Sequence, residues 1–285
     1  MKLFVKIFDF FLNSSVWVAI AVCALTEITC LNFELETPVS LLEFVFFGTI
    51  LGYNFIKYFE NKQLSVLHLN LTRINLIAVS KRFFRLKTQV KLMFFISVLS
   101  AIVCGVKILN LTEESLLLLV IPIILTFFYA ISFNKITLRS VTGIKIYIVG
   151  IVWALIAVLL PVLEAKIAPN YDVWLTFVQR VIFVVVLILP FDIRDLKVDR
   201  DELGTLPQKI GVKNTKLFGA VLLVFFYLLE FFKNSILEIN LIVLPIVVVV
   251  TFLLLMNSSE KQSKYYASFF VESIPLFWLL LLLIL

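Results

Sequence analysis

Three aspartates follow the sixth apolar segment of the chain at a spacing that places them on one face of a helix. Asp192, Asp195 and Asp199 occupy positions i, i+3 and i+7. Carboxylates this close repel one another unless a cation lies between them, and Mg²⁺ commonly bridges a few carboxylates to phosphate oxygens. The spacing is therefore consistent with a magnesium site. It is equally consistent with a solvated acidic helix start, because the helix dipole favours Asp near an N-terminus and basic neighbours such as Arg194 could neutralise the charges.

A second polar group closes the second apolar segment. Asn54, Lys57 and Tyr58 are spaced i, i+3 and i+4, so they share one face of a helix. Two further basic residues, Arg139 and Lys145, lie in and just after the basic connection near residues 134–143. Simple anchoring of positive residues on one side of a membrane explains this second pair without any function, although positions facing a binding cavity are also consistent with it.

The composition shows what kind of protein must position these groups. Apolar residues make up 62% of the 285, charged residues only 15%, and the mean hydropathy is +1.08. One compact core cannot hide this much apolar surface, so a soluble globular fold is excluded, as is a disordered chain. The formal net charge of +6 suits anionic lipid headgroups and gives no sign of a nucleic-acid surface. We expect an all-α polytopic membrane protein with one domain over residues 1–285.

Nine segments are long and apolar enough to span a membrane, which takes about 20 residues. They lie near residues 14–33, 38–60, 90–108, 113–133, 144–163, 172–190, 216–232, 238–256 and 267–285. The charge distribution predicts their orientation, since Lys and Arg are retained on the cytoplasmic side. Only Lys107, Lys166 and Lys233 fall on the opposite side from the N-terminus, with Arg180 inside a span. The N-terminus and the long basic loops are therefore expected to be cytoplasmic, in a membrane such as the bacterial inner membrane.

Other ionisable and sulfur-containing residues carry less information. The three cysteines lie in apolar segments without a metal-binding spacing, and His68 has no second ligand nearby, so zinc is not expected. Arg180 lies within the sixth span and needs a partner, for which Glu27 is at a comparable depth in the first span.

The aspartate cluster and the residues after it resemble the second aspartate-rich motif of the UbiA superfamily of intramembrane prenyltransferases. That motif runs DxxDxxxD with a trailing T-L-P and a glycine, and here residues 192–199 are followed by Gly204-Thr205-Leu206-Pro207 and by Gly211. The nine spans, the expected orientation, the long basic loops, and Lys145, Trp153 and Pro161 in the fifth span are also similar to the family. The resemblance covers nearly the whole chain.

The resemblance implies nine helices in a ring around a central cavity that opens to the cytoplasmic side and to the lipid. It implies transfer of an isoprenyl group from an isoprenyl diphosphate to an aromatic or other lipophilic acceptor, assisted by Mg²⁺. Asp192, Asp195 and Asp199 would hold the metal as the catalytic residues. The substrate-binding residues would be Asn54, Lys57, Tyr58, Arg194, Arg139 and Lys145.

One departure from the family pattern leaves two functions open. The first family motif reads roughly NDxxDxxxD, but here Tyr58 and Lys62 stand where its later aspartates belong after Asn54. Either Lys57 takes the place of one metal ion, or the protein is a homologue that binds a prenyl lipid without catalysis. For Lys57 itself the simpler reading is a snorkelling lysine that anchors the end of the span. The basic segment 67–87 is expected to be an interfacial helix or a cap over the cavity.

Overall fold

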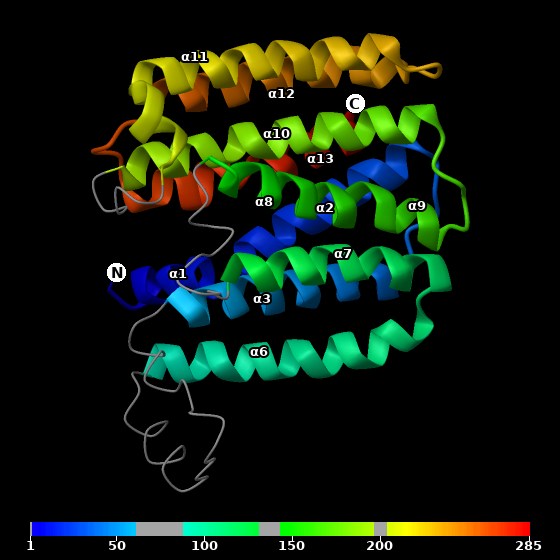
Figure 1. Ribbon diagram of the computed structural model, residues 1–285, viewed down its shortest axis with the longest axis horizontal. Coiled ribbons are helices and arrows are strands. Elements are labelled where there is room, and N and C mark those ends of the chain that lie inside the picture. Colours follow the sequence, from blue (N-terminus) through cyan, green and yellow to red (C-terminus); the bar gives the residue numbers. More distant parts are fainter. Residues whose placement is uncertain (1, 61–87, 131–142, 197–203) are drawn as a thin grey trace, which may run out of the picture.

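The computed structural model describes residues 2–60, 88–130, 143–196 and 204–285, and every element in these ranges is helical (Figure 1). The first half consists of α1 (Lys2–Asn13), α2 (Val16–Asn32), α3 (Val39–Glu60), α6 (Thr88–Lys107) with η1 (Ile108–Asn110), and α7 (Glu113–Ala130). The fifth span is built from α8 (Lys145–Ala154), the π-helix η3 (Leu155–Leu159) and α9 (Leu160–Glu164). The remainder consists of α10 (Tyr171–Asp195), α11 (Leu206–Leu228) with η5 (Leu229–Phe232), α12 (Glu238–Asn257), the π-helix η6 (Tyr266–Val271) and α13 (Ile274–Ile284).

Eight of the nine predicted membrane spans are confirmed, and two of their boundaries shift. Eight helices in the described ranges are long and apolar enough to cross a membrane, and a ninth span is formed if Ile7–Asn13 and Val16–Asn32, bent by 57°, are taken together. The sixth span continues to Asp195, beyond the predicted end at 190. The seventh begins at Leu206, not at 216, because the backbone N–H of Thr205 is capped by Oε1 of Gln208 at 2.8 Å and Pro207 suits a first helical turn. Gly211, with φ +77°, kinks this helix.

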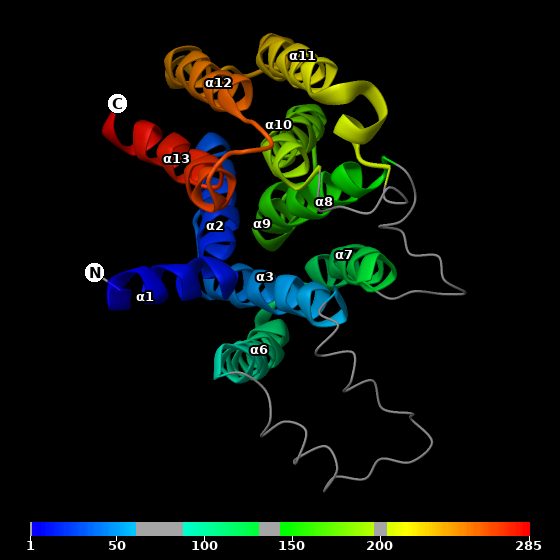
Figure 2. The same cartoon turned by 90° about the vertical axis from the view of Figure 1, so that its left-hand side faces the viewer.

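In the described ranges, seven of the nine predicted spans form a closed circuit of helix contacts, and the other two pack on its outside. Proceeding round it, α2 contacts α3, α3 contacts α7, α7 contacts the fifth span, and that span contacts α10. Helix α10 contacts α12, α12 contacts α13, and α13 returns to α2. Figure 2 shows this arrangement end-on, with α6 flanking α3 and α11 lying outside α10. The central cavity that the family resemblance implies remains a prediction.

One close helix contact sets the position of the candidate site. Gly150 of α8 faces α10 so closely that an added Cβ would lie 3.1 Å from the carbonyl oxygen of Val181 and 3.2 Å from Val185. Only glycine allows this approach without displacement. The contact holds α8 against α10 and so places the start of α8, Lys145, beside the end of α10. We call this end of the bundle, where α3 and α10 finish, the site end, and the other the far end.

The predicted orientation can be tested with two isosteric substitutions. Ser259 and Ser235 are both exposed, in connections at opposite ends of the bundle. In intact inner-membrane vesicles or cells, Ser259→Cys is expected to react with a membrane-impermeant maleimide only from the cytoplasmic side. Ser235→Cys is expected to react only from the opposite side. Reaction of both cysteines from one side would contradict the predicted topology.

Candidate functional site

Asp192 lies in the last turn of α10 and is almost completely buried. Its side chain is 1% exposed, and Nζ of Lys145 donates a hydrogen bond to its Oδ1 at 2.9 Å. A carboxylate at a helix C-terminus faces the negative end of the helix dipole, so this position is unfavourable unless a cation is close. The acidic helix start considered from the sequence is therefore wrong for Asp192 and Asp195, which end a helix. The lysine at the start of α8 supplies the required positive charge.

Asp195 is paired with its neighbour on the same helix. Arg194 donates from Nε and Nη2 to the two carboxylate oxygens of Asp195, both at 2.8 Å, and from Nη1 to Oγ of Ser268 at 3.1 Å. The guanidinium also lies over the ring of Phe191, 5.3 Å from its centre. This two-pronged geometry is the strong form of an arginine–carboxylate pair. It holds Arg194 between the end of α10 and the last span.

Asn54 and Lys57 meet at the bend between α1 and α2, which confirms that they share a face of α3. Oγ of Ser15, a residue with φ +67°, donates to Oδ1 of Asn54 at 2.9 Å. Nζ of Lys57 donates to Oγ of Ser15 at 2.9 Å and to the backbone oxygen of Asn13 at 2.8 Å. Asn54 is 5% exposed, and its Nδ2 has no hydrogen-bond partner among the described residues. Tyr58 is half-buried at the same helix end.

Glu272 is a candidate site residue that the sequence reasoning missed. It lies between the π-helix η6 and α13, is half-buried, and interacts electrostatically with both Lys57 and Arg194. It therefore links the α3 and α10 parts of the site. A carboxylate inside a predicted span was the available signal, because ionisable groups at membrane depth are functional candidates. π-Helical turns are frequent at functional sites.

An aromatic pair joins the same region from two facing helices. Nε1 of Trp153 in the fifth span donates to Oη of Tyr53 in α3 at 2.8 Å, and the two rings pack edge to face. Tyr53 is adjacent in sequence to Asn54, so this pair lies close along α3 to the polar end. The hydrogen bond therefore joins α3 to the fifth span across the bundle.

Two of the predicted site residues do not fall within the described ranges. Asp199 and Arg139 lie outside the described residues, as do Lys62 and His68. Within the described ranges there is no group of three or more carboxylate, histidine or cysteine side chains that could hold a metal ion. Asp192 and Asp195 offer the carboxylate oxygens that Mg²⁺ prefers, so their donor chemistry fits, and these two residues would hold the ion.

The charged side chains around Asn54 and Asp192 described above include equal numbers of cations and carboxylates. Three cations, Lys57, Lys145 and Arg194, accompany three carboxylates, Asp192, Asp195 and Glu272. Such a set can exchange its internal pairs for a divalent cation and a polyanion that arrive together. The carboxylates would turn to the metal ion, and the released cations would turn to the anion.

No protein-family model matches the chain, and no curated protein matches it in sequence. Solved structures do match over nearly the whole length. A structure from work on digeranylgeranylglyceryl phosphate synthase in membranes is 18% identical, with a TM-score of 0.57 over 98% of both chains.

Two further solved structures extend the likeness. The apo structure of a UbiA homologue from Aeropyrum pernix K1 is 10% identical, with a TM-score of 0.62 over 94% of this chain and 97% of its own. A UbiA homologue from Archaeoglobus fulgidus bound to GPP and Mg²⁺ is 11% identical, with a TM-score of 0.60 over 95% and 96%. Identities this low establish the architecture alone. The chain has the fold of the UbiA homologues.

Proposed function

We propose that the chain is an integral-membrane prenyltransferase of the UbiA superfamily. It would transfer an isoprenyl group from an isoprenyl diphosphate to an aromatic or other lipophilic acceptor. The observation that carries the proposal is the buried pair of Asp192 with Lys145 at the end of α10. Within a fold shared with a homologue bound to GPP and Mg²⁺, this pair offers both a metal ligand and a cation for diphosphate. The site end would face the cytoplasm.

The site residues divide into metal ligands and donors for the diphosphate. Asp192 and Asp195, together with Asp199, would hold Mg²⁺, which as a Lewis acid supplies stabilisation of the departing diphosphate. Lys145 and Arg194, released from their carboxylates, would bind diphosphate oxygens by charge-assisted hydrogen bonds. The buried amide Nδ2 of Asn54 is a further donor for these oxygens.

The bond changes of the proposed reaction require the apolar part of the site to stabilise a positive charge. The bond between the diphosphate oxygen and C1 of the prenyl chain breaks, and C1 then bonds to the acceptor, which loses a proton. Positive charge develops on the allylic carbons between these steps. The aromatic faces of Tyr53 and Trp153 can stabilise such a charge. Tyr58 would orient the acceptor or the departing group.

A second candidate function has its own support. Tyr58 stands where the first family motif has an aspartate, and the ammonium of Lys57 is already bonded to Ser15 and Asn13. A non-catalytic homologue that binds prenyl lipids would tolerate both features. The buried Asp192 favours the enzyme. A carboxylate at a helix C-terminus lowers the stability of the protein, and a role as a metal ligand would account for its presence there.

One experiment separates these functions. The purified full-length protein is incubated with dimethylallyl, geranyl, farnesyl and geranylgeranyl diphosphates, a lipophilic aromatic acceptor, and either Mg²⁺ or EDTA. A prenyltransferase is expected to release inorganic diphosphate from at least one donor, only with Mg²⁺. Saturable binding of a donor without any release, across the whole panel, would instead favour the lipid-binding homologue.

Lys57→Ala tests whether this ammonium contacts the substrate. The binding free energy for geranyl diphosphate is expected to weaken by about 1.5–3 kcal/mol, the range for hydrogen bonds to charged groups. Isothermal titration measures the effect. Lys264→Ala is the matched control, because Lys264 also binds α1, through Asp9 at 2.7 Å, but its side chain is 63% exposed. Equal affinities of wild type and Lys57→Ala would show that Lys57 only anchors the helix end.

A further inference from the structure

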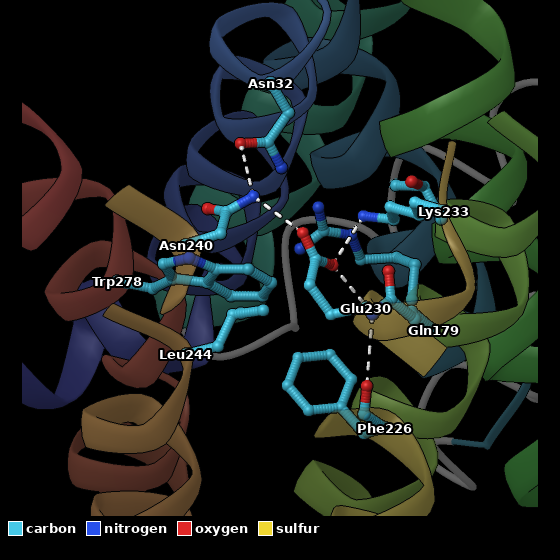
Figure 3. Close-up of a pocket in the computed structure, with 10 residues that line it drawn as sticks. Asn32, Gln179, Phe226, Glu230, Lys233, Asn240, Leu244 and Trp278 are labelled. Atoms are coloured by element: carbon cyan, nitrogen blue, oxygen red, sulfur yellow. Dashed lines mark hydrogen bonds and ion pairs between the residues drawn. The ribbon is translucent and has the colours of Figure 1, made fainter. Parts of the chain in front are cut away.

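A second polar cluster lies between the helices near the far end of the bundle, around Glu230 and Arg180 (Figure 3). It encloses a cavity with about 10 Å³ of room for the centre of a water-sized molecule. That is about the room that one water molecule needs. The lining comes from α2, α10, the end of α11, α12 and α13, so the cavity lies where several spans meet.

Both carboxylate oxygens of Glu230 are already satisfied. Glu230 is 1% exposed, and its Oε2 accepts from Nε2 of Gln179 at 3.0 Å and from Nζ of Lys233 at 2.6 Å. Its Oε1 accepts from Nδ2 of Asn240 at 3.0 Å. Figure 3 shows Glu230 between these donors. They come from three residues other than Arg180, so this carboxylate interacts with the guanidinium only electrostatically.

Arg180 is left with buried donors that lack acceptors. The residue is 1% exposed, and neither Nε nor Nη1 has a hydrogen-bond partner among the described residues. Nη2 is 3.5 Å from Oγ1 of Thr29, at the outer limit of a hydrogen bond. The guanidinium carbon lies 4.7 Å from the centre of the Trp278 ring, which covers one face and supplies no acceptor. A buried, charged donor in this state strongly favours a bound acceptor.

The other groups that line the cavity indicate the kind of acceptor that would bind there. Nε1 of Trp278 is a third N–H without a partner, whereas Oδ1 of Asn240 and the Thr176 hydroxyl are the unpartnered oxygens of the lining. The charged lining residues are two cations, Arg180 and Lys233, and one carboxylate, Glu230. The nearby Asp172 is not part of the lining, and its oxygens accept three N–H bonds from residues 234 and 235. Asp172 interacts electrostatically with Lys233, so the charges of this cluster are matched in number. The excess is one of donors, because the buried N–H groups of Arg180 and Trp278 have no acceptor among the described residues.

We propose that this cavity binds a small monovalent anion of the size of chloride, held by Arg180 and the indole N–H of Trp278. The site is separate from the one proposed for prenyl transfer, because Arg180 precedes Asp192 by about three turns of α10, or roughly 18 Å. Its occupant joins α10 to α13 through a charge and a hydrogen bond. Anion binding therefore stabilises the far end of the bundle.

The test measures thermal unfolding of the purified full-length protein as sodium gluconate is replaced by sodium chloride at constant ionic strength. Wild type is expected to gain about 2–5 °C in Tm along a saturable curve, since a ligand that binds only the folded state raises its stability. Arg180→Gln should lose this response. Lys264→Gln removes an exposed cation instead, and should keep it. The same Tm in chloride and gluconate for wild type would show that the cavity holds water only and would overturn the proposal.

A second variant keeps the test decisive if Arg180→Gln does not fold. Trp278→Phe keeps an aromatic ring beside the guanidinium but removes the N–H. The half-saturating chloride concentration is expected to rise about three- to tenfold, as for loss of one hydrogen bond. An unchanged half-saturating concentration would place the anion elsewhere and contradict the assignment.

Discussion

Asp192→Asn is expected to weaken the magnesium-dependent binding of geranyl diphosphate by about 100-fold. The substitution removes one candidate metal ligand and preserves the side-chain volume at a position that is 1% exposed. Loss of one partner from a buried charged interaction costs about 2–5 kcal/mol, and 100-fold corresponds to about 2.7 kcal/mol. The measurement is a titration of the folded variant with geranyl diphosphate in Mg²⁺ and in EDTA.

Asp172→Asn is the matched control for this prediction. Asp172 is also a buried aspartate of α10, but it lies in the first turn, where it binds the N–H groups of Asn234 and Ser235. The control variant should lose stability and keep its magnesium-dependent affinity. An Asp192→Asn protein that binds geranyl diphosphate as wild type does, in both solutions, would remove Asp192 from the metal site.

Lys145→Met is expected to lower the stability of the ligand-free protein by about 3–5 kcal/mol. The substitution leaves the carboxylate of Asp192 buried without its partner at 2.9 Å, at the unfavourable end of a helix. For a protein of this size, the change corresponds to a fall in Tm of about 6–12 °C. Thermal unfolding in detergent measures it.

The double variant identifies the cause of this loss. Adding Asp192→Asn to Lys145→Met removes the carboxylate that lost its ammonium partner, so most of the lost stability should return. Lys264→Met serves as the control, because the Lys264–Asp9 pair is largely exposed and such pairs contribute little. If the double variant were as unstable as the sum of the single variants, the two residues would not act as a buried pair.

The spans could be predicted from the sequence because hydropathy and length alone decide them. Polar residues at helix ends were harder to place. The seventh span begins at Leu206, ten residues before its apolar part, since Gln208 caps Thr205 and a helix can start in polar sequence. For the same reason the sequence did not show that Asp192 and Asp195 end a helix. Their charges are therefore those of an ion-paired helix end and not of a favourable helix start.

The partners of buried charges could not be predicted, because they depend on which helices meet. Lys145 and Asp192 are 47 residues apart and are joined by the close approach at Gly150. Glu27 was considered as the partner of Arg180 on depth alone, but the structure places the guanidinium beside Trp278, with Glu230 as its electrostatic partner. Glu272 was within a predicted span and could have been found by the rule that ionisable residues there are functional candidates.

The central claim is that the ion pairs at the site end exchange together for Mg²⁺ and diphosphate. Its most direct test is the Mg²⁺ dissociation constant of the full-length protein, titrated with and without saturating geranyl S-thiolodiphosphate, an analogue that ionises slowly. Because Asp192 and Asp195 are occupied by Lys145 and Arg194 until an anion takes these cations, the analogue should tighten Mg²⁺ binding at least about tenfold. Mg²⁺ should tighten analogue binding by the same factor. Equal Mg²⁺ dissociation constants with and without the analogue would contradict the exchange.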